Sequence, residues 1–147
     1  MSVRSFFDAN VLVYTDDADA DDKRERALEL WQAHRQANRA VISVQVLQEY
    51  FRVTTGKLAV DPSVAIEKLM LFSRADVVQA GATDVIAAAR LSVEQRLSFW
   101  DAMIVQMALV ADCALLYSED LQEGRRFAGL RVVNPFRRDA GVEPTGR

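Results

Sequence analysis

Short apolar runs alternate with longer segments of helical period along most of this chain of 147 residues. The runs consist mainly of aliphatic and aromatic residues and lack a regular polar alternation, which is typical of strands buried on both faces of a sheet. Five such strands are predicted, at Arg4–Phe7, Ala40–Ser43, Asp76–Gln79, Ala114–Tyr117 and Arg131–Asn134.

The segments between the strands repeat apolar residues every three or four positions, as amphipathic helices do. Asp61 followed by Pro62 is a typical helix start, and Gly56 marks a helix end. Strands that alternate with helices predict an α/β fold, here a three-layer α/β/α sandwich around a mostly parallel sheet of about five strands. The expected helices are Asp22–Ala37, Val44–Gly56, Pro62–Arg74, Thr83–Gln95 and Phe99–Ala111.

The length and composition suit one globular domain, which we expect over residues 1–136, followed by a flexible C-terminal tail over residues 137–147. Cys113 is the only cysteine, so no internal disulfide can form, which suits a cytoplasmic protein. The most apolar segment, Ala102–Ala111, is too short to cross a bilayer, and no membrane association is expected. The formal net charge of -3 predicts no general basic surface for nucleic acid.

The inventory of reactive side chains excludes several kinds of chemistry. His34 is the only histidine and lies in the middle of a predicted helix, where we expect a surface or half-buried side chain rather than a catalytic base. Ser–His and Cys–His mechanisms therefore lack a base, and zinc sites lack ligands. No glycine-rich phosphate-binding motif is present. Carboxylates, amides, hydroxyls and arginines remain, and such oxygen donors suit a hard cation such as Mg2+ or Mn2+.

Four carboxylates lie at positions where a charge is unexpected or where a strand ends. Asp8 and Asp120 follow the first and fourth strands, whose carboxyl ends are neighbours in the common doubly wound sheets. Glu49 and Asp101 lie in the second helix and at the start of the most apolar helix, where an unpaired buried charge would be costly. Simpler explanations stay open: Asp8 and Asp120 could form turns, Glu49 could belong to a solvated stripe, and Asp101 could complete a capping box with Ser98.

Gathering four carboxylates would destabilise the fold without a counter-charge. Two like charges about 4 Å apart repel by about 1 kcal/mol in water and about 4 kcal/mol at an effective dielectric constant of 20. A divalent cation would remove this repulsion, so the four positions make sense mainly as a metal site.

Four segments in this order resemble the PIN domain, and more narrowly the VapC-type toxins of toxin–antitoxin pairs: FFDANVLVY, LQEY, SFWDAMIVQMA and LLYSEDLQEG. The resemblance covers about residues 3–136. It implies a Mg2+- or Mn2+-dependent endoribonuclease that acts as the toxin of a type II pair, with RNA as substrate, a cognate antitoxin and a homodimer. It matches Asp8, Glu49, Asp101 and Asp120 to the acidic quartet of the family, and Asn10 and Ser118 to its supporting polar positions.

The resemblance also implies roles for these side chains. Asp8 and Asp101 would hold the first metal with help from Asn10, and the metal would activate a water for attack on phosphorus, leaving a 5′-phosphate. Glu49 and Asp120 would complete the pocket, directly or through water, and could hold a second metal. Because Glu119 is adjacent to Asp120, the sequence leaves open which of these two carboxylates faces the site. Candidate phosphate contacts are Arg52, Arg96, Arg125 and Arg126.

Two other function classes remain. The first is an aspartyl-phosphate phosphatase of the haloacid dehalogenase type with Asp8 as nucleophile, although Asn10 stands where that chemistry usually needs a second acid. The second is a PIN module that binds RNA or an antitoxin without catalysis. The intact set of four acids favours the nuclease over both.

Overall fold

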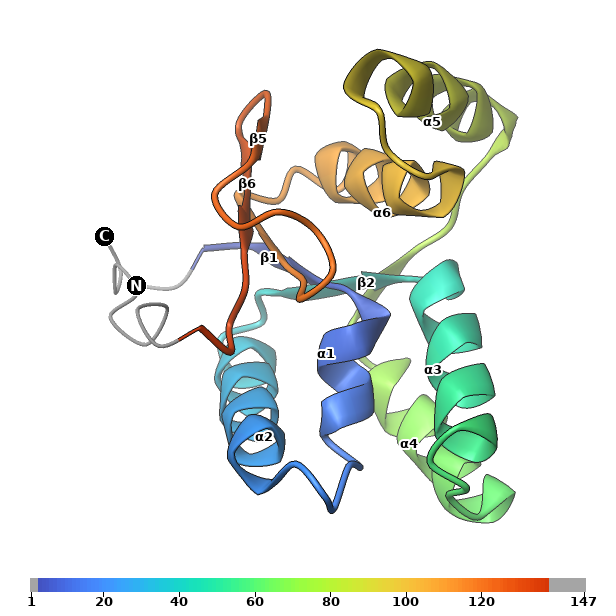
Figure 1. The fold of residues 1–147 in the computed structure, drawn as a ribbon, viewed down its shortest axis with the longest axis vertical. Helices are drawn as coiled ribbons and strands as arrows, with labels where there is room; N and C mark the ends of the chain where they lie inside the picture. The colour runs from blue at the N-terminus through green and yellow to red at the C-terminus, as the bar shows by residue number, and fades with distance from the viewer. Residues whose placement is uncertain (1–2, 138–147) are drawn as a thin grey trace.

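The structure is a computed structural model and describes residues 3–137. A single sheet of six strands lies between two layers of helices (Figure 1). This arrangement confirms the predicted three-layer α/β/α sandwich. The expected flexible tail lies outside the described residues from residue 138 onward. None of the helices in the described part is both long and apolar enough to span a membrane.

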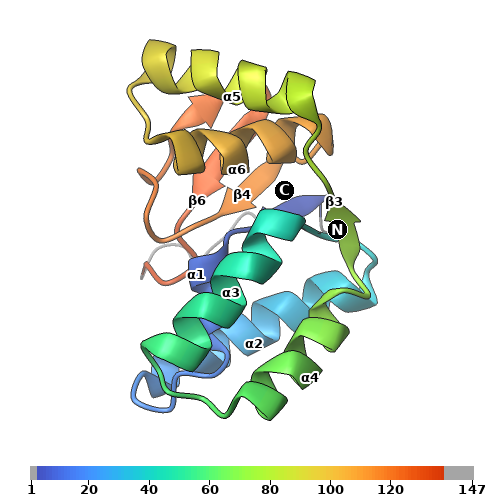
Figure 2. The same ribbon diagram turned by 90° about the vertical axis from the view of Figure 1, so that its right-hand side faces the viewer.

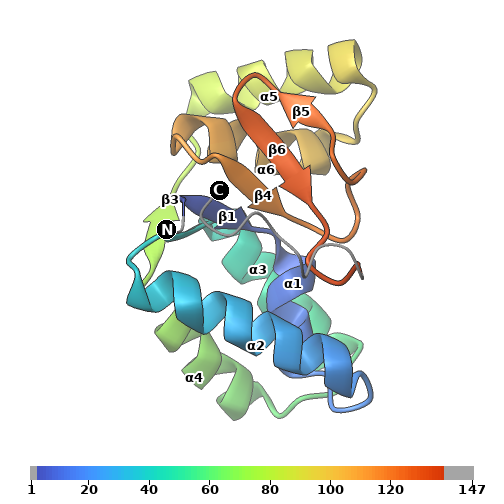
Figure 3. The same ribbon diagram turned by 90° about the vertical axis from the view of Figure 1, so that its left-hand side faces the viewer.

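The sheet has the strand order β3-β2-β1-β4-β6-β5. Five strands are parallel, as predicted, and only β5 runs antiparallel to its neighbour β6. The β5–β6 hairpin forms one edge of the sheet (Figure 3). The bounds are β1 Ser5–Phe7, β2 Ala40–Ser43, β3 Asp76–Val78, β4 Leu115–Tyr117, β5 Arg126–Phe127 and β6 Leu130–Val133.

Helices α1 to α4 cover one face of the sheet, and α5 and α6 cover the other (Figures 1 and 2). The five predicted helices are confirmed with ends shifted by at most two residues, and α1 is an addition that directly follows β1. The bounds are α1 Ala9–Tyr14, α2 Asp21–Gln36, α3 Val44–Gly56, α4 Pro62–Phe72, α5 Ala82–Gln95 and α6 Phe99–Val110.

The hydrophobic core is centred on the two strands β1 and β2, whose side chains are all buried. Aromatic rings pack edge to face beneath the sheet, with the Phe7 and Trp31 ring centroids 5.0 Å apart. Cys113 is also buried, and burial raises the pKa of its thiol to about 12. This core fixes β1 and β4 side by side, with Phe7 opposite Tyr117.

The prediction that His34 lies at the surface or half-buried was wrong. Its side chain is buried, its Nδ1 lies 2.9 Å from the carbonyl oxygen of Leu30, and its ring contacts those of Phe7 and Tyr117. A central position in a helix does not reveal which face meets the sheet, so the sequence left this open. His34 belongs to the core.

Candidate active site

The carboxyl ends of β1 and β4 meet at one edge of the sheet and bring the first two candidate residues together. Because Phe7 pairs with Tyr117, the next residues, Asp8 and Ser118, lie opposite each other. The Ser118 hydroxyl donates a hydrogen bond to Asp8 Oδ2 over 2.8 Å, and both side chains are buried. The predicted convergence of the first and fourth strand ends is therefore confirmed.

Asp8 is a buried carboxylate with an unfavourable charge. Its Oδ1 accepts the Ala9 backbone N–H at 2.8 Å, so it caps the short helix α1, and only 5% of the residue is exposed. Burial raises its pKa to about 7, against the lowering effect of the Ser118 and Ala9 hydrogen bonds, and the nearby charges of Glu49 and Asp120 raise it further. Near neutral pH this site favours a bound positive charge.

Asn10 connects Asp8, which follows β1, with the loop after β4. Its Nδ2 lies 3.3 Å from Asp8 Oδ2, 3.4 Å from Ser118 Oγ and 3.1 Å from Asp120 Oδ2. Its Oδ1 accepts the Glu119 backbone N–H at 3.1 Å. The single amide therefore fixes the β4 loop relative to Asp8.

The two adjacent acids after β4 have different surroundings. Glu119 accepts hydrogen bonds from Tyr14 at 2.7 Å and from Lys23 at 2.5 Å, and the Lys23 ammonium also lies over the Tyr14 ring. Asp120 is exposed and turns its carboxylate to Asn10. The charge of Glu119 is thus neutralised by a lysine, whereas Asp120 is the acid that stands beside Asp8.

Glu49 and Asp101 approach the same edge from two helices on opposite faces of the sheet. The Gln45 Nε2 of α3 donates to Glu49 Oε1 at 2.9 Å and to the Trp100 carbonyl oxygen of α6 at 3.3 Å. Ser98 caps α6 by accepting the Asp101 backbone N–H at 3.1 Å, as expected. These contacts hold both half-buried acids at the mouth of the strand ends.

One pocket with a volume of about 370 Å³ is lined by all four predicted acids together with Asn10. Within residues 3–137, no three histidine, cysteine, aspartate or glutamate side chains are arranged closely enough to hold a metal ion by themselves. A hard divalent cation that keeps several of its waters needs only one or two of these carboxylates. The oxygen donors and the raised pKa of Asp8 suit a hard cation in this pocket.

The structure separates the four arginines that were candidates for phosphate contacts. Arg52 of α3 is exposed and lines the acidic pocket. The other three are not among its lining residues, and Arg125 donates to the Gln95 carbonyl oxygen at 2.6 Å instead. Arg96 and Arg126 likewise do not line this pocket.

Lys57 lines the pocket and was not foreseen. The signal was present in the sequence, because Gln45, Glu49, Val53 and Lys57 are spaced by four positions and therefore share one face of α3. Lys57 therefore places a positive charge beside the acids while its own side chain stays exposed.

The acidic residues before α2 differ in their surroundings, and not all of them belong to a solvated helix start. Asp16 accepts hydrogen bonds from the Tyr50 hydroxyl and from Lys68 Nζ, the latter at 3.2 Å, and it is only partly exposed. Asp17 lines the acidic pocket. Only the later acids Asp21 and Asp22 fill the first turn of α2, where the helix dipole favours them.

The fold and the pocket define a doubly wound α/β domain with acids gathered at the carboxyl ends of its central strands. The sequence profile of the PIN domain matches residues 5–129, and the chain therefore belongs to the PIN domain family. This confirms the family predicted from the four motifs. Family membership leaves the haloacid dehalogenase alternative without support. A search of curated proteins found no significant match.

Two solved structures share the fold. One is Mycobacterium tuberculosis VapC20, described as a sarcin–ricin loop cleaving toxin, with a TM-score of 0.62 and 20% identity over 79% of this chain and 89% of that chain. The other is a toxin–antitoxin complex from Klebsiella pneumoniae, with a TM-score of 0.65 and 20% identity over 90% of this chain and 98% of that chain.

Proposed function

We propose that this PIN domain is a metal-dependent endoribonuclease that acts as the toxin of a type II toxin–antitoxin pair. The observation that carries the proposal is the meeting of Asp8, Glu49, Asp101 and Asp120 around one pocket. The structural neighbours support it, because one is named as an RNA-cleaving toxin and the other as a toxin–antitoxin complex.

Asp8 and Asp101 would hold Mg2+ or Mn2+ with help from Asn10, and Glu49 and Asp120 would complete the coordination directly or through water. A divalent cation bound there would acidify a water molecule and offset negative charge on the phosphate. Ser118 and the Ala9 backbone N–H orient the Asp8 carboxylate, so this ligand is fixed before any cation arrives.

Two cationic side chains at the pocket would bind the RNA substrate. Arg52 of α3 and Lys57, which directly follows α3, are exposed and line the acidic pocket, where they would contact phosphates on either side of the cleaved bond. Their positive charges compensate for the acids, which alone would repel RNA. Arg96, Arg125 and Arg126 are not among the residues that line the pocket and would contact more distant phosphates.

The proposal includes a cognate antitoxin, a homodimer and a cytoplasmic location. Two helices on opposite faces of the sheet each carry several exposed apolar side chains, which would be covered in a protein interface. These side chains are Val64, Ile66, Met70 and Leu71 on α4 and Val85, Ile86 and Val93 on α5. Analytical ultracentrifugation of the chain alone and with a candidate antitoxin measures both associations.

The nuclease proposal is tested by cleavage of single-stranded RNA in Mg2+, in Mn2+ and in EDTA. We expect cleavage only with a divalent ion, and a loss in Asp8→Asn and Asp101→Asn that exceeds the about 10- to 100-fold typical for an outer partner of a metal ligand. Glu94→Gln, which changes an exposed acid of α5, is the matched control and should keep full activity.

Two outcomes would contradict the proposal. Undiminished cleavage in EDTA would rule out the metal mechanism. Tight RNA or antitoxin binding without cleavage in either metal would favour the non-catalytic PIN module.

A further inference from the structure

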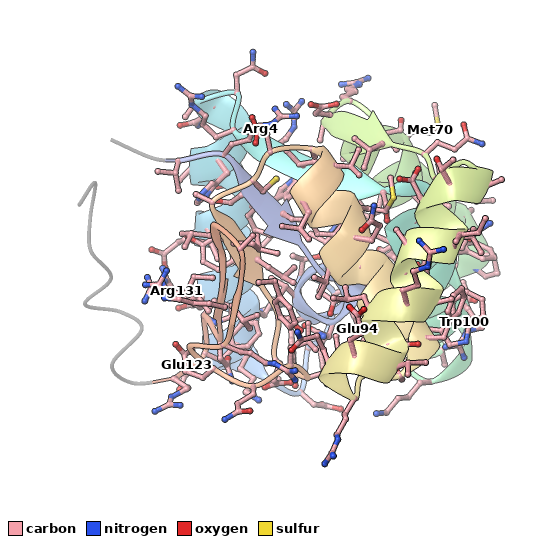
Figure 4. The ribbon with its side chains drawn as sticks, turned by 90° about the horizontal axis from the view of Figure 1, so that it is seen from above. Arg4, Met70, Glu94, Trp100, Glu123 and Arg131 are labelled. Atoms are coloured by element: carbon pink, nitrogen blue, oxygen red, sulfur yellow. The ribbon has the colours of Figure 1, made fainter. Side chains whose placement is uncertain are left out.

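Trp100 is a large apolar side chain that is exposed at the margin of the acidic pocket. It is the second residue of α6, directly before Asp101, and 62% of it is accessible to solvent. Its side chain lies at the edge of the molecule beside α3 (Figure 4), to which its carbonyl oxygen is joined through Gln45. Leaving an indole in water forgoes a large gain from burial, so an exposed Trp beside a candidate active site indicates a contact with a ligand.

A second, smaller pocket with a volume of about 230 Å³ adjoins the acidic pocket on this side. The two pockets share Gln45 and Trp100, so these residues form the wall between them. The second pocket is also lined by the buried thioether side chains of Met103 and Met107. Its volume is below the about 300–1,000 Å³ of pockets for drug-sized ligands, which suits a smaller planar occupant.

The polar lining of the second pocket consists of neutral side chains, with no acid and no cation. Besides Ser43 and Gln45, it includes the amides of Gln48 and Gln79, which are both exposed. Within residues 3–137 no hydrogen bond engages either of these two amides. A glutamine amide presents both a donor and an acceptor, which is the pattern found on the edges of the nucleobases.

We propose that the second pocket binds one unpaired base of the RNA substrate, which stacks on the Trp100 indole while Gln48 and Gln79 contact its edge. This inference rests on the proposed nuclease function and specifies its substrate as single-stranded RNA. A charged pocket for the phosphate next to a neutral, partly aromatic pocket for the base matches the two halves of a nucleotide. Single-stranded RNA is recognised in this way, by stacking on aromatic side chains and by hydrogen bonds to base edges.

Binding is measured in the Asp8→Asn background, in which RNA should be bound without being cut, with Asp101→Asn as a second background if the first does not fold. The probes are single-stranded RNA oligonucleotides and the same oligonucleotides with an abasic nucleotide at the cleaved step. Trp31 is buried and Trp100 exposed, so the fluorescence of Trp100 is obtained by subtracting the spectrum of the Trp100→Phe variant.

We expect intact RNA to quench Trp100 and the abasic RNA to do so much less. Trp100→Ala should weaken RNA binding about 5- to 150-fold, the range that corresponds to loss of one base–aromatic stack, and Trp100→Phe should weaken it less. Val110→Ala removes an exposed apolar side chain at the other end of α6, outside both pockets, and should leave binding unchanged.

A second experiment sequences the ends left when wild-type protein cleaves a randomised RNA pool. We expect a base preference at one position beside the cut, and its loss in Gln48→Ala and Gln79→Ala but not in Gln36→Ala, an exposed glutamine of α2 outside both pockets. Loss of preference at that one position, with cleavage retained, is the signature of a base contact.

The outcomes separate this inference from the function on which it rests. RNA cleavage together with unchanged binding by Trp100→Ala would overturn the base pocket alone and would assign the exposed indole to a protein contact. Equal quenching by intact and abasic RNA would also overturn it. Absence of both RNA binding and RNA cleavage would overturn the base pocket and the nuclease proposal together.

Discussion

Asp8 combines good hydrogen bonding with a charge that the fold disfavours. Donors from Ala9 and Ser118 hold both carboxylate oxygens, yet burial and the charges of Glu49 and Asp120 outweigh them and raise its pKa to about 7. A protein gains no stability from such a carboxylate when it is ionised. A cation that binds the Asp8 carboxylate would have to replace its proton. The metal affinity of the site should therefore depend on pH.

This pKa predicts how stability without metal depends on pH. The pKa of folded Asp8 lies above its ordinary value of 3.8, so the folded state binds the proton more tightly than the unfolded state. The resulting stabilisation is complete below about pH 4 and is lost as pH rises to about 7. In EDTA, Asp8→Asn should therefore become more stable than the wild type above pH 7, by up to about 4 kcal/mol, and the gap should close toward pH 4.

Urea unfolding at pH 5 and pH 8 in EDTA measures this difference. Glu94→Gln is the matched control, because Glu94 is an exposed acid of α5 outside the acidic pocket. If the difference in free energy of unfolding between Asp8→Asn and wild type is the same at both pH values, ionisation of Asp8 does not destabilise the metal-free protein.

The residue scale is also where the sequence was least able to decide. Glu119 and Asp120 are adjacent acids in a turn, and nothing local distinguishes them. The choice is made by Lys23, which lies 96 positions earlier in the chain and neutralises Glu119. Asp8, Asn10 and Ser118 could be placed together in advance because a parallel sheet aligns strand ends, whereas side-chain pairing between a helix and a loop follows no such rule.

At the scale of elements, the site depends on how α3 and α6 are held together across the edge of the sheet. Gln45 makes this connection by donating both to Glu49 and to the Trp100 carbonyl oxygen. The two helices supply one acid each, so a small relative movement would change the spacing of Glu49 and Asp101. If the proposed metal site is correct, Gln45 would position two of its acids without being a ligand itself.

Replacing Gln45 by Leu should affect metal binding more than folding. Loss of ordinary hydrogen bonds should lower the free energy of unfolding by about 1 kcal/mol. Loss of an outer partner of a ligand should weaken Mg2+ binding by about 10- to 100-fold. Isothermal titration with Mg2+ and urea unfolding measure the two quantities on the same samples, and Gln45→Glu, which adds an acid at the same place, tests the electrostatic contribution separately.

Gln36→Leu, on an exposed position of α2, is the matched control. An unchanged affinity for Mg2+ in Gln45→Leu would mean that the α3–α6 connection has no part in the metal site.

Most elements were foreseeable because their patterns are long or strongly apolar. The two that were missed are α1, with six residues, and β5, with two. Six residues are less than two helical turns, too few to establish a period, and β5 exists only because it pairs with β6. The sequence therefore predicts the layers of the sandwich, but not the short segments that tertiary contacts create.

At the scale of the whole molecule, a bound cation should stabilise the fold. The repulsion among the acids destabilises only the folded state, where Asp8, Glu49 and Asp120 are close enough to interact. Mass action adds about 2.7 kcal/mol when free Mg2+ is 100-fold above its Kd. For a domain of this size the gain corresponds to a rise in Tm of about 5–11 °C.

Thermal unfolding in Mg2+ and in EDTA, at equal ionic strength, measures this rise. Asp8→Asn should show a much smaller rise in Tm, because it lacks the carboxylate that would bind the cation. A rise of equal size in wild type and Asp8→Asn would indicate that Mg2+ acts at the general surface and not in the acidic pocket.

The hydrogen bond between Ser118 and Asp8 has a consequence for biosynthesis. It joins residues 110 positions apart, because the central strand β1 is made early and its neighbour β4 late. At about 5–20 residues per second, roughly 5–20 s of translation separate the two. A nascent chain, or one truncated before β4, holds its first acid without the partners that orient it. If the protein is a toxin, its active site can therefore assemble only after nearly the whole domain has emerged from the ribosome.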